Sequence, residues 1–572
     1  MAFSSSVLNG ERAVVVLFIG RVLYSLPLSF LVHGLMLSLL AAFALYVEVR
    51  VESSNSPSIF RTRPGVSSGI LLGAVTVPTV MLSKLIQLSR AFSLHQVELG
   101  ELYYMTIQYW ATSASCFSVL VFICLFILRS PETTHAPFPR NDRDAKFSSR
   151  WIALCAAACC MSLALLLLGG LSASLKFLWV LCHGLAAIAL VRHFLTTFPS
   201  CVSIGEALLV TTGLVLYFGD MLTCTATAAK FYGYLPLSMV PLQNVVKRTE
   251  IAIINQGLLL ALLLFPIVFK YLLRIKDWYL SLANSEARRD GEIAKSLLFF
   301  SSLGFMLIMI APSWIQFVED FHLHPFLWVI SFVFSEPFKR LSLCFYWVSV
   351  IYVSVLRFYN ISKNSKIERI LLRKYYHLMA VSMFLPALIF QPEFLDLAFG
   401  AALAVFLGLE IIRVWRIWPL GKLIHEFMNA FTDHRDSDLL IISHFSLLLG
   451  CALPIWMSAG YNDRPLAPFA GILSLGIGDT MVREASVVGY KYGVLRWSKT
   501  GKKTIEGTAA GITSVLAACS ILLPLLASTG YILSQHWFSL LLAVTVSGLL
   551  EAYTAQLDNA FIPLVFYSLL CL

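Results

Sequence analysis

Apolar runs of membrane-spanning length recur along the chain from about Val14 to the last residue, and short polar loops separate them. A helix that crosses a bilayer needs about 20 predominantly apolar residues, and measured against that length the runs amount to roughly 13 to 16 spans. The composition agrees, because 58% of the 572 residues are hydrophobic and only 13% are charged. We therefore predict an all-α, polytopic transmembrane protein.

The first apolar run extends from Ala13 to Val47 and is interrupted only by Arg21 and His33. It is too long for the apolar core of a cleaved signal peptide, and no small-x-small cleavage site leads into polar sequence. We expect a retained signal anchor, made of one span or of two closely spaced spans.

The net charge of +10 need not indicate nucleic-acid binding. In a membrane protein such an excess is typical of cytosolic loops that follow the positive-inside bias. The twelve cysteines are scattered and none forms a CxxC pair. They predict small buried side chains, not a metal site or a disulfide framework.

The chain changes character near residue 356. Residues 1–356 are apolar spans joined by loops that contain no recognisable group of catalytic or ligand-binding residues. Residues 357–572 carry long polar clusters with acids, histidines and paired bases. Two apolar runs separate each cluster from the next, so we expect all the clusters on one membrane face. We therefore predict an N-terminal multi-span region (1–356) and a chemistry-bearing membrane domain (357–572).

Charge predicts which face this is. Loops 357–374, 413–438 and 479–503 hold 6, 4 and 6 Lys and Arg residues, sixteen in total, whereas the opposite hairpins hold only Arg464. The cluster face is therefore predicted to be cytosolic. A site on that face can use a cytosolic nucleotide.

The polar stretch from Gly476 to Gly511 is the main candidate for a phosphate site. Asp479 follows a glycine and suits a metal ion held on phosphates, while lysines supply charge and glycines allow close backbone approach. No GxxxxGK[ST] sequence is present, so a P-loop is not indicated. Taken alone, the lysine pair is also typical of a basic anchor on anionic lipid headgroups. The candidate nucleotide-binding residues here are Gly478, Thr480, Gly489, Gly493, Lys502, Lys503, Thr504, Glu506 and Gly507.

Glu551 and Asp558 are the second pair of candidate catalytic carboxylates. They are seven residues apart with Thr554 between them, so on one continuous helix all three would share a face. Acids near the end of an apolar run are costly in a bilayer and are usually functional. We expect them to bind metal or to accept a proton from an alcohol; the alternative is that both lie in interfacial water.

Weaker candidates lie between these two stretches. Asp433 and Asp436 belong to an acidic loop that would suit Mg²⁺ or would simply be solvated. Arg373 and His377 share a helical face at a membrane entry, which suits either phosphate contact or interfacial anchoring. Glu410 and Arg413 are three residues apart and either act in a site or pair with each other.

The C-terminal third resembles the dolichol kinase family, the CTP-dependent polyprenol kinases of the endoplasmic reticulum. The resemblance covers about 200 residues, and its last three motifs together are the most specific. In chain order the motifs are RKYYHL (373–378), GLEIIR (408–413), WPLGKLIHEFMNAFTD (418–433), SHFSLLLGCALPIW (443–456), GIGDT (476–480), KKTIEGT (502–508) and EAYTAQLDNAFIPL (551–564).

The resemblance implies transfer of the γ-phosphate of CTP to dolichol, with Mg²⁺ or another divalent cation, on the cytosolic face of the endoplasmic reticulum membrane. It implies a site built on Asp479, Lys502, Lys503 and the motif that follows them, with Lys503 among the catalytic residues. The product would be dolichyl phosphate, the lipid carrier of protein glycosylation. Residues 357–572 would then be the catalytic domain.

One departure from the family pattern concerns the same stretch. The pattern runs closely as Gly-Asp-Thr-x-Ala-Ser, whereas here Val482, Arg483 and Glu484 stand as additional residues before Ala485. Three residues added within a helix shift it by about 4.5 Å and 300°. Unless they bulge out, we expect them to displace Gly489 and Gly493 from Asp479.

Two other functions fit parts of the sequence. A cytidylyltransferase would attack the α-phosphorus of CTP and release pyrophosphate. A transporter would place charges near the centres of spans and show paired repeats, and the sequence shows neither.

Overall fold

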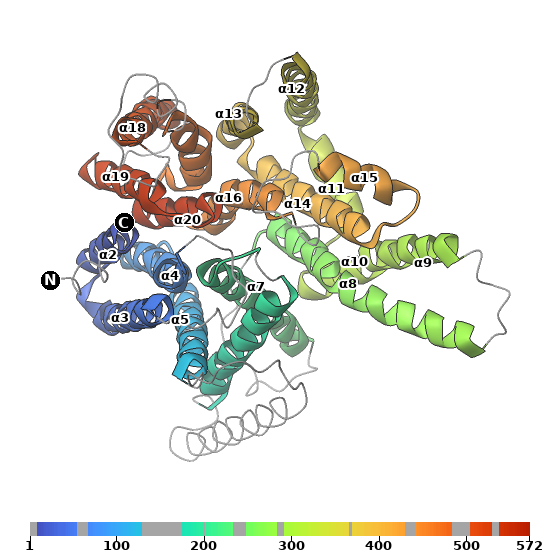
Figure 1. Cartoon of the computed structure of the whole chain (residues 1–572), viewed down its shortest axis with the longest axis horizontal. Helices are drawn as coiled ribbons and strands as arrows, with labels where there is room; N and C mark the ends of the chain where they lie inside the picture. The colour runs from blue at the N-terminus through green and yellow to red at the C-terminus, as the bar shows by residue number, and fades with distance from the viewer. Residues whose placement is uncertain are drawn as a thin grey trace. The chain divides into compact units, whose positions relative to one another are not determined.

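The computed structural model describes residues 9–53, 67–128, 174–198, 201–232, 248–282, 291–364, 369–429, 441–482, 485, 504–528 and 537–572. Every regular element within these ranges is helical (Figure 1). Ten of these helices are long and apolar enough to cross a membrane, and six shorter apolar helices accompany them. The predicted all-α polytopic fold is confirmed, whereas the total of 13 to 16 spans stays a prediction, because the ten long helices are counted within the described ranges alone.

The chain divides into two compact units, residues 1–246 with 571–572, and residues 247–570. The boundary falls before the change of chemistry at residue 356, so a separate catalytic domain over 357–572 stays a prediction. The first unit contains α2 (Gly10–Tyr24), α3 (Leu31–Ser53), α4 (Ile70–Ser93), α5 (Leu99–Leu128), the helix Ser174–Thr197 and α7 (Ile204–Phe231).

The second unit runs from α8 to α20. Its helices are α8 (Glu250–Leu282), α9 (Gly291–Phe305), α10 (Ala311–Val318), α11 (Pro325–Ser335), α12 (Pro337–Asn364), α13 (Arg369–Phe390), α14 (Pro392–Trp415), α15 (Leu420–Asn429), α16 (Ile442–Ser458), the helix Ile472–Val482, α18 (Ile505–Ser528), α19 (Trp537–Tyr553) and α20 (Asp558–Leu570).

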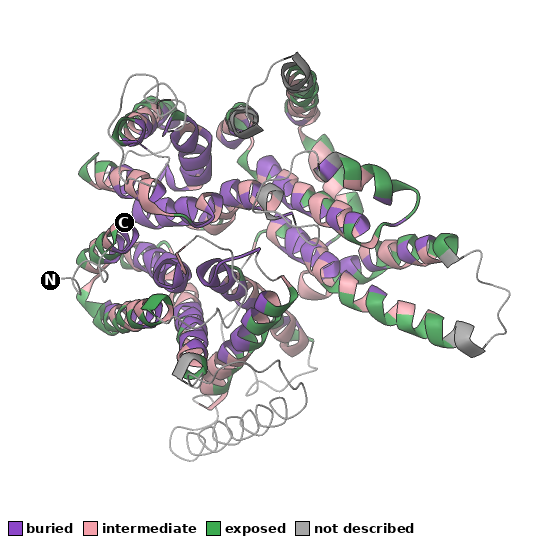
Figure 2. Cartoon of the chain, viewed as in Figure 1, coloured by how far each residue is buried: buried purple, intermediate pink, exposed green. Residues whose placement is uncertain are grey.

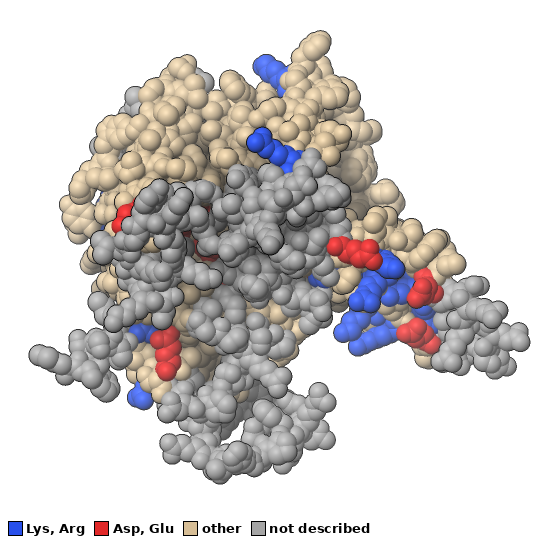
Figure 3. Space-filling view, turned by 45° about the horizontal axis from the view of Figure 1, so that its top comes forward, with Lys and Arg blue, Asp and Glu red and all other residues tan. Residues whose placement is uncertain are grey.

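The surface is apolar over long stretches, as a bilayer requires. Large hydrophobic side chains such as Leu28 and Phe338 are each 91% exposed. Figure 3 shows broad areas without charge, and charged side chains gathered around the end of α8 and the start of α9. Exposed apolar area on this scale is what lipid, and not water, would cover.

The first unit is organised around α4, which is buried along nearly its whole length (Figure 2). The apolar run at Ala13–Val47 forms two helices, α2 and α3, with a break before the short 3-10 turn Leu28–Phe30. Arg12 of α2 bonds Glu48 of α3 at 2.7 Å, and the Glu48 carboxylate also accepts the Leu71 N–H at the start of α4, at 2.6 Å. One buried ion pair therefore connects three helices.

In the second unit, the helix Ile472–Val482 packs against α13, α16, α18 and α20. Glycines stand where the helices come closest. A Cβ on Gly471 would collide with the Gly450 carbonyl of α16, and a Cβ on Gly476 would collide with Val381 of α13. Small residues at such contacts let membrane helices approach backbone to backbone.

We predict that Gly471→Val destabilises the protein by about 1–3 kcal/mol, because the added side chain has no space against α16. Gly408→Val in α14 is the matched control, since a Cβ there meets no atom within 4 Å. Thermal unfolding of both variants in detergent would test this. Equal unfolding temperatures for the two variants would contradict the packing described.

Candidate functional site

Asp479 and His377 form a buried pair between two helices. The His377 Nδ1 atom of α13 lies 2.9 Å from Asp479 Oδ2, and each residue is only 4% exposed. The same Nδ1 atom lies 3.2 Å from the Leu475 carbonyl oxygen. Because both partners are acceptors, Nδ1 carries the hydrogen and donates it. The histidine therefore orients Asp479 in this structure; the expected contact of His377 with phosphate is a different role.

The helix that carries Asp479 is not a regular α-helix. Residues Ile472–Gly478 are in π-helical conformation, and the Asp479 N–H bonds the Ser474 carbonyl five residues earlier. Such wide turns are rare and occur frequently at functional sites. Gly478 packs against Val515 of α18, and a Cβ on Gly511 would lie close to the Gly478 carbonyl. Gly478 thus serves helix packing here.

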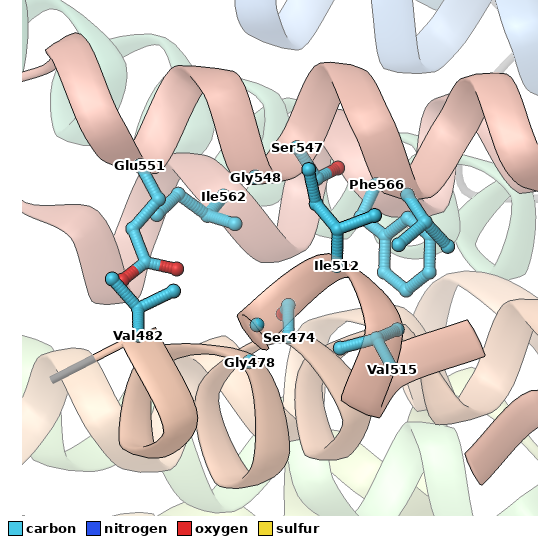
Figure 4. Close-up of a pocket in the computed structure, with 12 residues that line it drawn as sticks. Ser474, Gly478, Val482, Ile512, Val515, Ser547, Gly548, Glu551, Ile562 and Phe566 are labelled. Carbon is cyan, nitrogen blue, oxygen red and sulfur yellow. The ribbon is translucent and has the colours of Figure 1, made fainter. Parts of the chain in front are cut away.

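Glu551 lies at the end of α19 and is 3% exposed. It lines a narrow pocket between the helix Ile472–Val482, α18, α19 and α20. Figure 4 shows its carboxylate at one end of the pocket beside Val482, while Phe566 and Val515 stand at the other end. The pocket therefore joins one buried carboxylate to an apolar interior.

Asp558 is in a different position, and the expected single helical face is wrong. Helix α19 ends at Tyr553 and α20 begins at Asp558, so Glu551, Thr554 and Asp558 are not on one helix. The Thr554 hydroxyl accepts the Gln556 N–H at 3.2 Å, a side-chain bond that competes with helical continuation. Asp558 is half-buried in the first turn of α20 and does not line the pocket.

The start of α18 explains part of the KKTIEGT motif. The Thr504 hydroxyl accepts the Gly507 N–H at 3.0 Å, which is the geometry of a helix N-cap. Glu506 is exposed in the first turn, where a negative charge is favourable. Thr504 therefore has a structural role, and the helix start that it caps is a type of site that suits anions.

Several predicted residues lie outside the part of the chain that the structure describes. They are Gly489, Gly493, Lys502, Lys503, Asp433, Asp436 and the side chain of Arg373. Their expected roles therefore stay predictions.

Among the described residues, no group of three or more His, Cys, Asp or Glu side chains could hold a metal ion. A cage made only of protein ligands is thus not present within those ranges. Mg²⁺ commonly uses one or two carboxylates and completes its shell with phosphate oxygens and water. Asp479 fits that pattern, and the neighbouring Thr480 hydroxyl is buried with no hydrogen-bond partner within the described ranges.

Val482, the first of the three additional residues, belongs to the helix of Asp479 and is 2% exposed. It packs closely against Gly511 and lines the pocket. Arg483 and Glu484 are outside the described ranges. Val482 therefore takes part in the packing of this helix on α18.

Two features could not be identified from sequence. The His377–Asp479 pair joins residues 102 positions apart, and the pocket draws on four helices. Glu410 and Arg413, left open above, bond each other at 2.6 and 2.8 Å, and Glu410 also accepts the Ile441 N–H. These three contacts are structural and connect α14 to the start of α16.

Comparison with known proteins gives consistent similarities. The family model described as dolichol kinase matches residues 175–465, a range that ends before Asp479. The chain is 62% identical to dolichol kinase EVAN of Arabidopsis thaliana over 578 residues, which covers 100% of this chain and 99% of that protein. It is 32% identical to human dolichol kinase over 390 residues, which covers 65% of each chain. It is also 32% identical to the Saccharomyces cerevisiae dolichol kinase over 247 residues, which covers 42% of this chain and 43% of the yeast protein. No solved structure matches the chain.

We predict that His377→Leu lowers the free energy of unfolding by on the order of 3 kcal/mol, because the buried Asp479 carboxylate loses this donor. His377→Asn is the matched variant, since its amide N–H can occupy the place of Nδ1 and should retain most of the stability. Thermal unfolding of the two purified variants would decide. Equal losses of stability in the two variants would show that the hydrogen bond from Nδ1 does not stabilise the protein.

Proposed function

Because the chain belongs to the dolichol kinase family, we propose that it transfers the γ-phosphate of CTP to the hydroxyl of dolichol. The products are dolichyl phosphate and CDP. The observation that carries the proposal is the similarity from end to end to a plant dolichol kinase, at 62% identity. The relatives reported above give no support to a cytidylyltransferase or a transporter.

The two buried carboxylates, Asp479 and Glu551, are proposed to have different roles in the reaction. Phosphoryl transfer depends mainly on positioning and on stabilising charge, and the weakly nucleophilic alcohol needs a proton acceptor late in the step. Glu551 is the better acceptor, because it faces an apolar pocket that suits a lipid, whereas Asp558 lies outside that pocket. The alcohol oxygen bonds the γ-phosphorus, the bond from that phosphorus to the β-phosphate oxygen breaks, and the alcohol proton passes to Glu551.

Asp479, with the Thr480 hydroxyl beside it, would hold a divalent cation on the phosphates of CTP. Such a cation neutralises charge on the phosphates. The chain's own contribution is to keep the Asp479 carboxylate in one orientation through His377. A hydrogen bond from a neighbouring side chain commonly orients a metal-binding carboxylate in this way.

The remaining nucleotide contacts follow from the sequence. Lys502 and Lys503 directly precede the capped start of α18 and would neutralise phosphate charge there, with Gly489 and Gly493 allowing close backbone approach. The excess of sixteen basic residues over one supports a cytosolic position for this face. We place the protein in the endoplasmic reticulum membrane, as the family resemblance implies.

We expect purified protein with dolichol, Mg²⁺ and γ-labelled CTP to move the label to the lipid and release CDP. Asp479→Ala should abolish this transfer, because the phosphates would lose their metal-holding carboxylate. Product analysis by thin-layer chromatography would measure both. Labelled pyrophosphate with cytidine on the lipid would instead identify a cytidylyltransferase, and a fully active Asp479→Ala variant would exclude the metal-holding role.

Glu551→Gln should lower kcat by about 10²- to 10⁴-fold with little change in the KM for CTP, because the amide cannot accept the alcohol proton. Asp558→Asn is the matched control and should cost less than about tenfold, since Asp558 lies outside the pocket. Steady-state kinetics with dolichol would compare the two. The reverse order of effects would assign the base to Asp558.

A further inference from the structure

The pocket beside Glu551 has the form of a site for an amphiphile. Its walls come from four helices and leave a cavity of only about 20 Å³, so side chains must shift before a lipid can enter. Apart from Glu551 and two serines, the lining is apolar or glycine.

The pocket extends along α19 and α20, from the helix ends that meet near Glu551 toward their middles. Glu551 is near the last residue of α19, and Val544 is seven residues, or about 10 Å, deeper along the same helix. Phe566 is eight residues into α20, about 12 Å from the residue that begins it at the same face. With the polar clusters at the membrane surface, as the sequence predicts, the carboxylate would stand at that surface and the apolar end inside the bilayer.

A second polar group faces the same space. Ser547 is one helical turn from Glu551, is 6% exposed and lines the pocket. Its hydroxyl has no hydrogen-bond partner within the ranges that the structure describes. A buried hydroxyl in that situation is costly unless something bonds it, and an alcohol in the pocket would do so.

We propose that this pocket binds the hydroxyl-terminal isoprene units of the lipid substrate, with the alcohol between Glu551 and Ser547. The inference rests on the proposed function and adds the place where the acceptor lipid is held. An acyclic isoprenoid alcohol matches both ends of the pocket, since it has one polar terminus and a branched hydrocarbon chain. The rest of the chain lies outside the pocket, among the lipids.

The shape of the pocket has a consequence for selectivity. Apolar walls select a ligand by its shape and volume, because they offer the hydrocarbon chain of the lipid no hydrogen bonds. Because the pocket is narrow, admitting a branched chain requires flexible side chains such as Ile512 to shift. Added bulk on the wall should therefore weaken lipid binding and leave nucleotide binding alone.

Two valines on α19 provide a matched test. Val544 and Val546 are 2% and 3% exposed, but only Val544 lines the pocket. We expect Val544→Phe to raise the KM for dolichol by about tenfold, equivalent to about 1.4 kcal/mol, with the KM for CTP unchanged. Val546→Phe should leave the ratio of the two KM values as in the unaltered protein, even if overpacking lowers its unfolding temperature.

If the protein phosphorylates dolichol and both variants shift the two KM values alike, the pocket assignment is wrong and the kinase function stands.

A second experiment, photolabelling, does not depend on turnover. A citronellol analogue carrying a diazirine should label peptides of the helix Ile472–Val482, α18, α19 or α20, with dolichol as competitor. Labelling without phosphoryl transfer would overturn the function and retain the pocket, and labelling confined to other helices would overturn the pocket.

Discussion

Close backbone contact around the helix Ile472–Val482 is the feature on which the rest of the site depends. In lipid, helices gain little from the hydrophobic effect, so they associate through close packing and a few polar bonds. Glycines at 471, 476 and 511 let α16, α13 and α18 reach this helix. That contact brings Asp479 within bonding distance of His377 and places Val482 in the wall of the pocket.

The two buried carboxylates differ in their surroundings, and we propose separate roles for them on that basis. Asp479 is oriented by an imidazole N–H and lies at the end of a π-helical segment. Glu551 faces an apolar pocket near the end of α19. An oriented carboxylate beside a buried hydroxyl suits a cation on phosphates, while a carboxylate at the mouth of an apolar pocket suits an alcohol.

Other buried charges connect helices and need no chemistry to explain them. Arg12 with Glu48 and Glu410 with Arg413 are complete pairs that also bond a backbone N–H at the start of another helix. A buried charge is tolerated when it is paired and hydrogen-bonded. Burial of a charge alone therefore does not distinguish a functional site from a structural contact in this protein. The pocket beside Glu551 is the feature that sets this carboxylate apart from the structural ion pairs.

The sequence by itself determined the all-α membrane class and the resemblance to one family, because apolar run length and short motifs are local properties of the chain. It named Asp479, Glu551 and His377 but left His377 between phosphate contact and interfacial anchoring, and it expected Glu551 and Asp558 on one helical face. Only the tertiary structure paired His377 with Asp479, broke the helix between Tyr553 and Asp558, and formed the pocket. Those results depend on how closely distant helices pack, which no local pattern specifies, and on the hydrogen bond that the Gln556 N–H donates to the Thr554 hydroxyl.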